Sequence, residues 1–151
     1  MCEIKFAQFD TPLGSMIATA DETALYRLEF AGHTHIESEF TPPMRSIEKE
    51  LRQYFDGKLR VFKTPLFLCG TPFQKQVWEQ LQKIPYGETI SYEALAVAVG
   101  NPQGCRAVAQ ANGANPCAVI IPCHRVINKN GNLGGYASGI SRKQWLLHHE
   151  Q

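Results

Sequence analysis

The sequence lacks several features that would define whole classes of protein. No apolar run approaches the roughly 20 residues that span a bilayer, and the first five residues lack the basic and apolar regions of a signal peptide. We find no repeat or low-complexity tract in the 151 residues. We therefore expect a globular protein with no membrane partner that stays where it is made, in the cytoplasm, or in the nucleus of a eukaryote.

Disulfide and metal patterns are also missing. The five cysteines are an odd number and contain no Cys-x-x-Cys pair, which argues against a disulfide framework or a local zinc site. The histidine pairs at 33/35 and 148/149 have no cysteine or carboxylate cluster at zinc spacing. The glycine-rich segment 131–135 lacks the Lys-Ser/Thr of a phosphate loop. We expect no metal ion and no cofactor.

Charge is nearly balanced overall but not along the chain. The net charge of +1 combines eight Lys and Arg against ten Asp and Glu in residues 1–70 with seven against four in residues 71–151. The second half is the candidate for an anionic partner, although dedicated nucleic-acid-binding domains are often far more basic. We predict two subdomains with these bounds, the first structural.

The first half predicts a small antiparallel meander followed by a helix. Residues 4–30 alternate as strands do around a turn at 10–14. Apolar residues between Ile47 and Phe55 recur at helical spacing, and the helix should end at Asp56-Gly57. A further strand is expected near 59–62. No constellation of reactive residues occurs in this half.

The second half predicts helices with clear capping signals. Thr71, a following proline and Gln74 form a capping box for a helix to about Lys83. Ser91 should cap a second helix that Gly100 stops, and Asn101-Pro102 should cap a third. Ser141 with Gln144 suggests another capping box near the C-terminus.

The second and third of these helices form a helix-turn-helix pattern. Such a pair is equally common as a packing unit in helical domains. Arg106, however, is a long cation among small residues, so the helix could approach a nucleic-acid backbone closely. The small residues could equally serve tight helix packing.

Cys123 is the strongest candidate for chemistry. It follows an apolar segment and the stiff Pro122, and it precedes His124 and Arg125, which supply a base and a positive charge that favour the thiolate. A buried structural cysteine is the alternative. A cysteine hydrolase is a second alternative, but adjacent Cys and His make an awkward dyad and no oxyanion-hole motif is evident.

The string Pro122-Cys123-His124-Arg125-Val126 resembles the signature of the O6-alkylguanine-DNA alkyltransferases. The similarity extends in order through the second half, and the turn at 10–14 also resembles that family. Its further motifs are Tyr86-Gly87-Glu88, Ser91-Tyr92, Gly100-Asn101-Pro102, Arg106-Ala107-Val108, Asn115-Pro116, Gly135-Tyr136 and Trp145 to Glu150.

The resemblance implies an α+β protein: a small ribonuclease-H-like α/β subdomain followed by a helical domain with a winged-helix type of helix-turn-helix. It implies DNA repair by direct reversal, in which an alkyl group moves irreversibly from O6-alkylguanine, or O4-alkylthymine, to Cys123. The partner would be double-stranded DNA that contains the lesion, bound by a monomer. A protein that binds the lesion without repairing it is the alternative, against which Cys123, His124 and Glu150 argue.

The same resemblance implies catalytic roles. His124 would draw the thiol proton through a water, and Glu150 would orient the imidazole. Tyr92 would protonate the departing guanine at N3, and Asn115 would brace the turn before the active-site segment.

Binding roles follow from the resemblance as well. Arg106 would fill the gap left by a flipped nucleotide, and the base pocket would contain Tyr136, Ser138 and Val126. The remaining DNA contacts would come from Tyr92, Gly104, Cys105, Ala107 and Arg125.

The expected zinc ligands are one departure from the family. Some relatives bind a structural zinc ion in the N-terminal domain. Cys2 matches one ligand, but Asp21 and Tyr26 stand where a cysteine and a histidine would be expected, so we expect no zinc.

Overall fold

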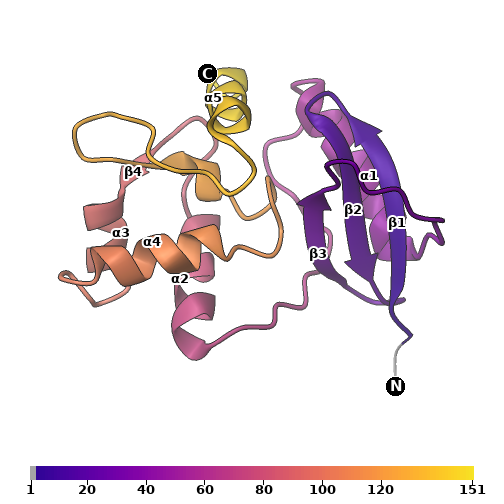
Figure 1. Ribbon diagram of the computed structural model, residues 1–151, viewed down its shortest axis with the longest axis horizontal. Helices are drawn as coiled ribbons and strands as arrows, with labels where there is room; N and C mark the ends of the chain where they lie inside the picture. The colour runs from indigo at the N-terminus through magenta and orange to yellow at the C-terminus, as the bar shows by residue number, and fades with distance from the viewer. Residues whose placement is uncertain (1–2) are drawn as a thin grey trace. The chain divides into compact units, whose positions relative to one another are not determined.

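The computed structural model describes residues 3–151 (Figure 1). The chain divides after Cys69 into two compact units, residues 1–69 and 70–151. Cys2, considered above as a zinc ligand, lies outside the described residues. In the described part of the chain, no helix is both long and apolar enough to cross a membrane.

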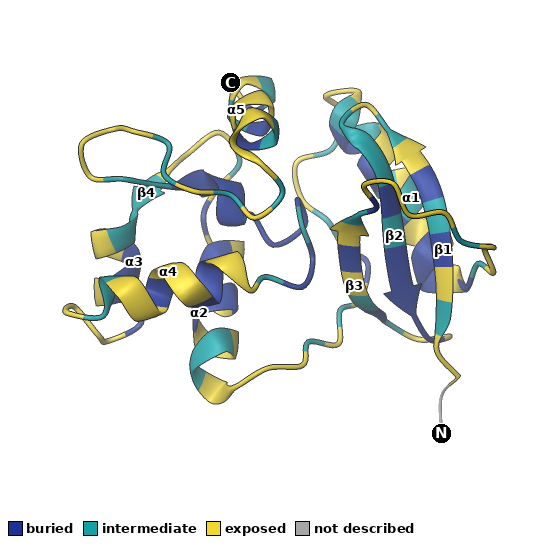
Figure 2. Ribbon diagram, in the orientation of Figure 1, coloured by how far each residue is buried: buried dark blue, intermediate teal, exposed yellow. Residues whose placement is uncertain are grey.

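The N-terminal unit is a three-stranded antiparallel sheet covered by one helix. The strands β1 (Lys5–Thr11), β2 (Gly14–Ala20) and β3 (Leu25–Phe30) pair in the order β1-β2-β3. The helix α1 (Pro42–Phe55) packs on β1 and β2. Buried positions alternate along β1 and recur at helical spacing along α1, so one face of each element forms the core (Figure 2).

The end of α1 agrees with its sequence, but the strand expected near residues 59–62 is absent. Gly57 adopts a φ of 76° directly after the C-cap Asp56. The segment that follows α1 is irregular, and just beyond residues 59–62 the amides of Lys63 and Thr64 donate to Glu50 at 2.8 and 3.0 Å. A single parallel bridge joins it to the sheet, between Leu25 and Leu66.

In the C-terminal unit, α2 (Pro72–Gln82) begins with the predicted capping box. The Thr71 hydroxyl accepts from the Gln74 amide at 3.1 Å, and Gln74 Oε1 accepts from the Thr71 amide at 3.0 Å. The buried Trp78 indole donates to the Ala111 carbonyl at 2.9 Å, which joins α2 to the last turn of α4.

The helices α3 (Tyr92–Ala98) and α4 (Cys105–Gly113) form the helix-turn-helix. Ser91 caps α3 as predicted by accepting from the Ala94 amide at 3.0 Å. The expected cap at Asn101-Pro102 is wrong, because α4 begins later with Gly104 as its N-cap. Residues 101–104 instead form a turn in which the Gly104 amide donates to the Asn101 carbonyl.

A two-stranded parallel pairing and a last helix complete the unit. The strands β4 (Ile90–Ser91) and β5 (Val126–Ile127) pair next to the 3-10 turn η1 (Cys123–Arg125). The helix α5 (Ile140–His149) begins after Gly139, whose φ is 104°. The predicted capping box is wrong, because Ser141 lies inside this helix. The α+β class predicted from the sequence is confirmed.

Candidate active site

A tight turn sets the backbone that leads to Cys123. Asn115 spans it: Oδ1 accepts from the Cys117 amide at 2.9 Å, and Nδ2 donates to the Ile121 carbonyl at 2.7 Å. Val119 adopts a left-handed φ of 71°, a strained state for a β-branched residue that the surrounding bonds must hold. Cys123 then begins η1, with its own amide bonded to the Ile121 carbonyl at 2.7 Å.

Cys123 lies in the wall of an open cavity of about 650 Å³. Cys123 itself is only 7% exposed. Cavities of this size commonly hold small-molecule ligands. The lining comes from α3, α4, η1 and the loop before α5: Tyr92, Glu93, Cys105, Arg106, Ala109, Asn112, Gly113, Cys123, Asn128, Gly134, Gly135, Tyr136 and Ala137.

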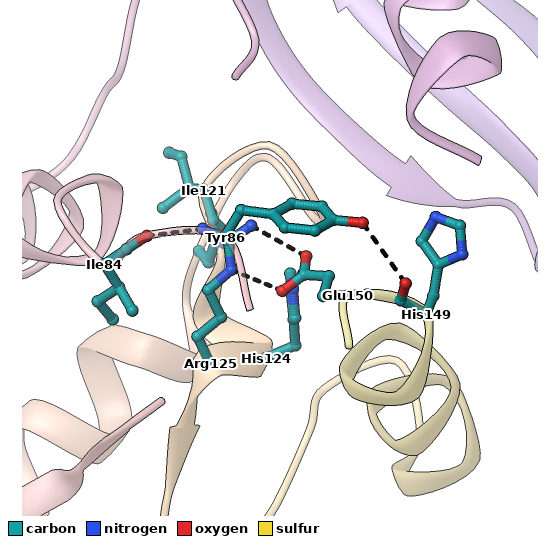
Figure 3. A network of polar contacts seen from close by, with 8 residues as sticks. Ile84, Tyr86, Ile121, His124, Arg125, His149 and Glu150 are labelled. Atoms are coloured by element: carbon teal, nitrogen blue, oxygen red, sulfur yellow. Dashed lines mark hydrogen bonds and ion pairs between the residues drawn. The ribbon is translucent and has the colours of Figure 1, made fainter. Parts of the chain in front are cut away.

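A buried polar network joins η1, which begins with Cys123, to the C-terminal end of α5 (Figure 3). Glu150 accepts from Arg125 Nε at 2.8 Å and Nη2 at 2.9 Å, and its Oε2 lies 2.8 Å from His124 Nε2. Arg125 Nη1 donates to the Ile84 carbonyl at 2.7 Å. Because a carboxylate only accepts hydrogen bonds, His124 Nε2 carries the proton and, in the neutral ring, Nδ1 is the bare nitrogen.

Burial controls the protonation of Cys123 and His124. It raises the pKa of the Cys123 thiol, an effect that a hydrogen bond from Asn115 and the charge of Lys143 partly offset. Burial lowers the pKa of His124, which Glu150 partly offsets. Both groups are therefore neutral near pH 7. His124 Nδ1 has no hydrogen-bond partner among the described residues, so it is available as a base.

Two tyrosines of the cavity remain protonated over the physiological range. Burial and the nearby Cys123 raise the pKa of Tyr92, the first residue of α3. Burial raises the pKa of Tyr136 far above its usual value, and its hydroxyl has no partner among the described residues. Both hydroxyls can donate a hydrogen bond to a molecule in the cavity.

The helix α4 presents small residues to the solvent near the cavity. Arg106 and Ala107 are exposed, and Gly104 and Cys105 are partly exposed. A Cβ at Gly104 would lie 2.1 Å from the side-chain nitrogen of the exposed Asn101, so a larger residue there would require the Asn101 side chain to move. Arg106 and Cys105 line the cavity, so the predicted DNA-facing residues and the predicted acceptor border one space.

Some predicted site residues lie elsewhere. The prediction that Arg125 contacts DNA is wrong, because its guanidinium is buried against Glu150 and the Ile84 carbonyl. Among the residues described, Ser138 and Val126 are not part of the cavity lining, where Ala137 lies instead of Ser138. The Ser138 carbonyl accepts from Arg142, and Val126 is buried in β5.

Two polar residues of the site were not predicted from the sequence. Lys143 is completely buried, and Asn112 is 5% exposed in the cavity wall with Nδ2 at 3.5 Å from the Cys123 carbonyl. Lys143 has no local signal, because a lysine in the first turn of a helix is expected in solvent. Asn112 stands between Ala111 and Gly113, and an asparagine in such a place is just as typical of an ordinary helix end.

The residues that stand at the expected zinc positions have other partners. Asp21 Oδ2 accepts from the Tyr26 hydroxyl at 2.6 Å, and Oδ1 accepts from the amides of Thr23 and Ala24. No group of three or more histidine, cysteine and acidic side chains that could hold a metal ion occurs within residues 3–151.

Comparison with known families gives two matches that together cover nearly all of the chain. Residues 72–151 match the model of the DNA binding domain of 6-O-methylguanine DNA methyltransferase, and residues 4–68 match that of its ribonuclease-like domain. Both the predicted family and the predicted ribonuclease-like fold of the N-terminal half are confirmed.

Individual proteins match over nearly the whole chain. A methylated-DNA–protein-cysteine methyltransferase of Methanosarcina acetivorans is 44% identical, with 94% of this chain and 95% of that protein covered. A constitutive one of Bacillus subtilis is 40% identical, with 94% and 92% covered.

Solved structures agree as well. The crystal structure of Mycobacterium tuberculosis O6-methylguanine methyltransferase has a TM-score of 0.89 at 38% identity and covers 98% of this chain and 93% of its own. Mycobacterium tuberculosis OGT in complex with DNA has a TM-score of 0.87 at 40% identity and covers 96% and 91%. The chain belongs to the 6-O-methylguanine DNA methyltransferase family.

Proposed function

We propose that this protein repairs double-stranded DNA by moving an alkyl group from the O6 position of guanine, and from O4 of thymine, to the sulfur of Cys123. The observation that carries the proposal is the placement of Cys123. It lies in the wall of a cavity that the helix-turn-helix also borders, next to a histidine held by a carboxylate. The relatives named above are methylated-DNA–protein-cysteine methyltransferases, and one related structure contains DNA.

The transfer begins with deprotonation of Cys123. The bare Nδ1 of His124 takes the thiol proton through a water molecule, and Glu150 stabilises the imidazolium through Nε2. Arg125 holds both carboxylate oxygens, so Glu150 cannot turn away from His124. A neutral Cys123 thiol next to a neutral His124 ring suits this task, because the buried thiolate then forms only when its proton has an acceptor.

The thiolate attacks the alkyl carbon in an SN2 step. The new C–S bond forms as the C–O6 bond breaks, and its electron pair moves into the guanine ring. Tyr92 donates its proton to guanine N3, which makes guanine a better leaving group. The resulting phenolate recovers a proton, in net terms the one that left Cys123. The products are unmodified guanine and a thioether, and nothing in this chemistry reverses the thioether.

The reaction requires the base to leave the duplex, because a protein thiol cannot reach O6 inside the stack. Extrusion costs a few kcal/mol, less for a weakened base pair. The small exposed residues of α4 allow close approach to the minor groove, and Arg106 enters the stack in place of the extruded nucleotide. The cavity takes the base, with Tyr136 in its wall. All these residues come from one chain, which acts as a monomer.

A mass measurement tests the proposal. The intact protein is mixed with an excess of duplex that contains O6-methylguanine and is then digested. We expect a stable gain of one methyl group on the peptide of Cys123 and a plateau of one repaired guanine per protein molecule. Binding without an adduct would indicate a lesion-binding protein, and repair beyond one guanine per molecule would indicate a turnover enzyme.

A further inference from the structure

Asn128 presents an unused side-chain amide in the wall of the Cys123 cavity. It follows β5 directly and lines the cavity. Its backbone is held in a tight turn: its N–H donates to the Asn132 carbonyl at 2.9 Å, and its carbonyl accepts from the Gly131 N–H at 2.9 Å. Within residues 3–151, its side-chain amide has no hydrogen bond to another residue. A fixed backbone with an unused amide is suited to contact a bound molecule.

The oxygen of this amide and the Tyr92 hydroxyl border one point of the loop wall. A Cβ placed on Gly134 would lie 3.3 Å from the Tyr92 hydroxyl oxygen and 3.4 Å from Asn128 Oδ1. The two polar atoms come from different elements, since Tyr92 begins α3 and Asn128 follows β5. Gly134 leaves the point between them open because it has no side chain. The wall therefore carries a hydroxyl donor and an amide acceptor close together.

This pair of groups matches the minor-groove edge of guanine. Guanine presents there an acceptor, N3, and a donor, the 2-amino group, and both are attached to C2. Alkylation of O6 leaves both groups in place. Thymine presents only an acceptor, O2, on the same edge. A hydroxyl that donates to N3 and an oxygen that accepts from the 2-amino group therefore distinguish guanine from thymine.

We propose that Asn128 is a specificity-determining residue: its Oδ1 accepts a hydrogen bond from the 2-amino group of the flipped O6-alkylguanine while Tyr92 donates to N3. The proposal rests on the function proposed above and deepens it, because it makes alkylguanine the preferred substrate and alkylthymine the poorer one. An alkylthymine in the cavity leaves the amide oxygen without a donor, and a polar group that loses its partner on binding lowers the affinity.

Two other side chains with carbonyl or carboxylate oxygens line the cavity, and neither is placed as well. Asn112 Oδ1 is fully buried, and Asn112 Nδ2 lies 3.5 Å from the Cys123 carbonyl, so α4 would have to move before a base could bond to that oxygen. Glu93 is exposed in the first turn of α3, where its charge is solvated and opposes the phosphates of DNA. Asn128 is neutral and half-buried, so it can accept from a base without these costs.

A substrate without the 2-amino group tests the contact. Methyl transfer to Cys123 is measured in single turnover, at saturating protein, with duplexes that contain O6-methylguanine or O6-methylhypoxanthine. The two bases also differ in pairing and as leaving groups, so the guanine-to-hypoxanthine rate ratio of each variant is compared with that of the native protein. We expect Asn128→Leu to lower this ratio about fivefold or more, as the loss of one hydrogen bond does.

Three matched variants identify the responsible acceptor. Asn128→Asp keeps an acceptor oxygen and should keep the native ratio, because its charge acts on both rates alike. Asn130→Ala removes the bond from the Asn132 N–H to Asn130 Oδ1 at 3.0 Å, which loosens the same turn outside the cavity, and should also keep the ratio. Asn112→Leu should keep it as well. The proposal is overturned if Asn128→Leu retains the native ratio, or if any of these three variants lowers the ratio as much.

A measurement on the native asparagine covers an Asn128→Leu protein that does not fold. Side-chain amides labelled with ¹⁵N are followed in Cys123→Ser while it binds each duplex without reaction. The Asn128 signal should shift further with methylguanine than with methylhypoxanthine, and equal shifts would overturn the proposal. Failure of the proposed function has a different signature, because no methyl group would then appear on Cys123 of the native protein from either duplex.

Discussion

The two units bury polar groups of different kinds. The N-terminal unit buries three threonines and Asp21 among its described residues, so its one buried charge is Asp21, which is bonded by Thr23, Ala24 and Tyr26, at most five residues away. The C-terminal unit buries His124, Arg125, Lys143 and Glu150, whose bonds join residues up to 41 apart.

This difference separates a scaffold from a reactive site. A local turn satisfies its polar groups as soon as it forms. A buried network of charges that are distant in the sequence costs desolvation free energy and is often no more stabilising than apolar residues of the same volume. Its presence beside Cys123 is therefore better explained by chemistry than by stability.

Removing the sulfur should have the largest effect. Cys123→Ser should abolish methyl transfer, because a hydroxyl is far harder to ionise than a thiol. DNA binding should persist, because α4 is unchanged. The matched control is Cys69→Ser, which alters an exposed cysteine of the N-terminal unit and should transfer normally. Single-turnover repair and duplex binding measure the two properties. Transfer by Cys123→Ser near the normal rate would exclude Cys123 as the acceptor.

Breaking a buried pair should cost much more than breaking an exposed one. Glu150→Gln leaves Arg125 without its carboxylate, and removing one partner of a buried pair costs about 3–5 kcal/mol of unfolding free energy. The control Glu29→Gln breaks the exposed pair with Arg27, at 3.1 Å, and should cost no more than about 1 kcal/mol. Denaturant unfolding measures both. Similar costs would contradict the contrast between the units.

Arg106 should act on extrusion of the base. Arg106→Ala should slow repair of duplex DNA about tenfold or more. A tenfold change corresponds to about 1.4 kcal/mol of free energy, which is part of the few kcal/mol that flipping the base costs. Alkylation by free O6-alkylguanine should change little. Gln110→Ala, on an exposed position of the same helix, is the control. Rates are compared at saturating protein, and equal slowing with both substrates would place Arg106 in chemistry or folding instead.

In the glycine-rich loop 131–135, the rate of transfer should be sensitive to substitution of Gly134 and tolerant of substitution of Gly131. Both glycines are left-handed, with φ of 73° and 89°, so alanine should cost each roughly 1–2 kcal/mol of stability. Only at Gly134 does the added Cβ meet Tyr92, at 3.2 and 3.3 Å from Cε2 and the hydroxyl. We expect Gly134→Ala alone to slow transfer. If Gly131→Ala slows transfer equally, loop strain rather than the Tyr92 contact is responsible.

Asp21 should give the smallest effect, confined to the N-terminal unit. Its hydrogen bonds, first that from Tyr26, hold the pKa of Asp21 far below its usual value. Because the folded-state pKa is the lower one, these bonds stabilise the unit above the unfolded-state pKa, and the contribution is lost as the pH falls toward the folded-state value. Asp21→Asn should weaken this acid dependence. Denaturant unfolding between pH 7 and 3, followed by NMR of the Met16 and Leu28 methyl groups, measures it. An unchanged dependence would show that Asp21 does not cause it.

The sequence predicted the features that depend on neighbours along the chain. The capping box at Thr71 and Gln74, the cap at Ser91 and the end of α1 at Asp56-Gly57 each involve residues within a few positions, and the structure confirms them. Where local patterns had competing partners they failed. The expected strand at 59–62 is absent, next to the amides of Lys63 and Thr64 that bond to Glu50, and Ser141 lies inside α5 rather than at its start.

The sequence by itself also identified the family and Cys123, because the string around the thiol is contiguous and its spacing needs no folding to read. Only the tertiary structure decided which charges surround the sulfur. It turned Arg125 inward to Glu150 and buried Lys143 on three loop carbonyls. The reason is physical: the protonation of a group depends on burial and on charges that are near in space, and residues 143 and 150 become neighbours of the site only when the chain has folded.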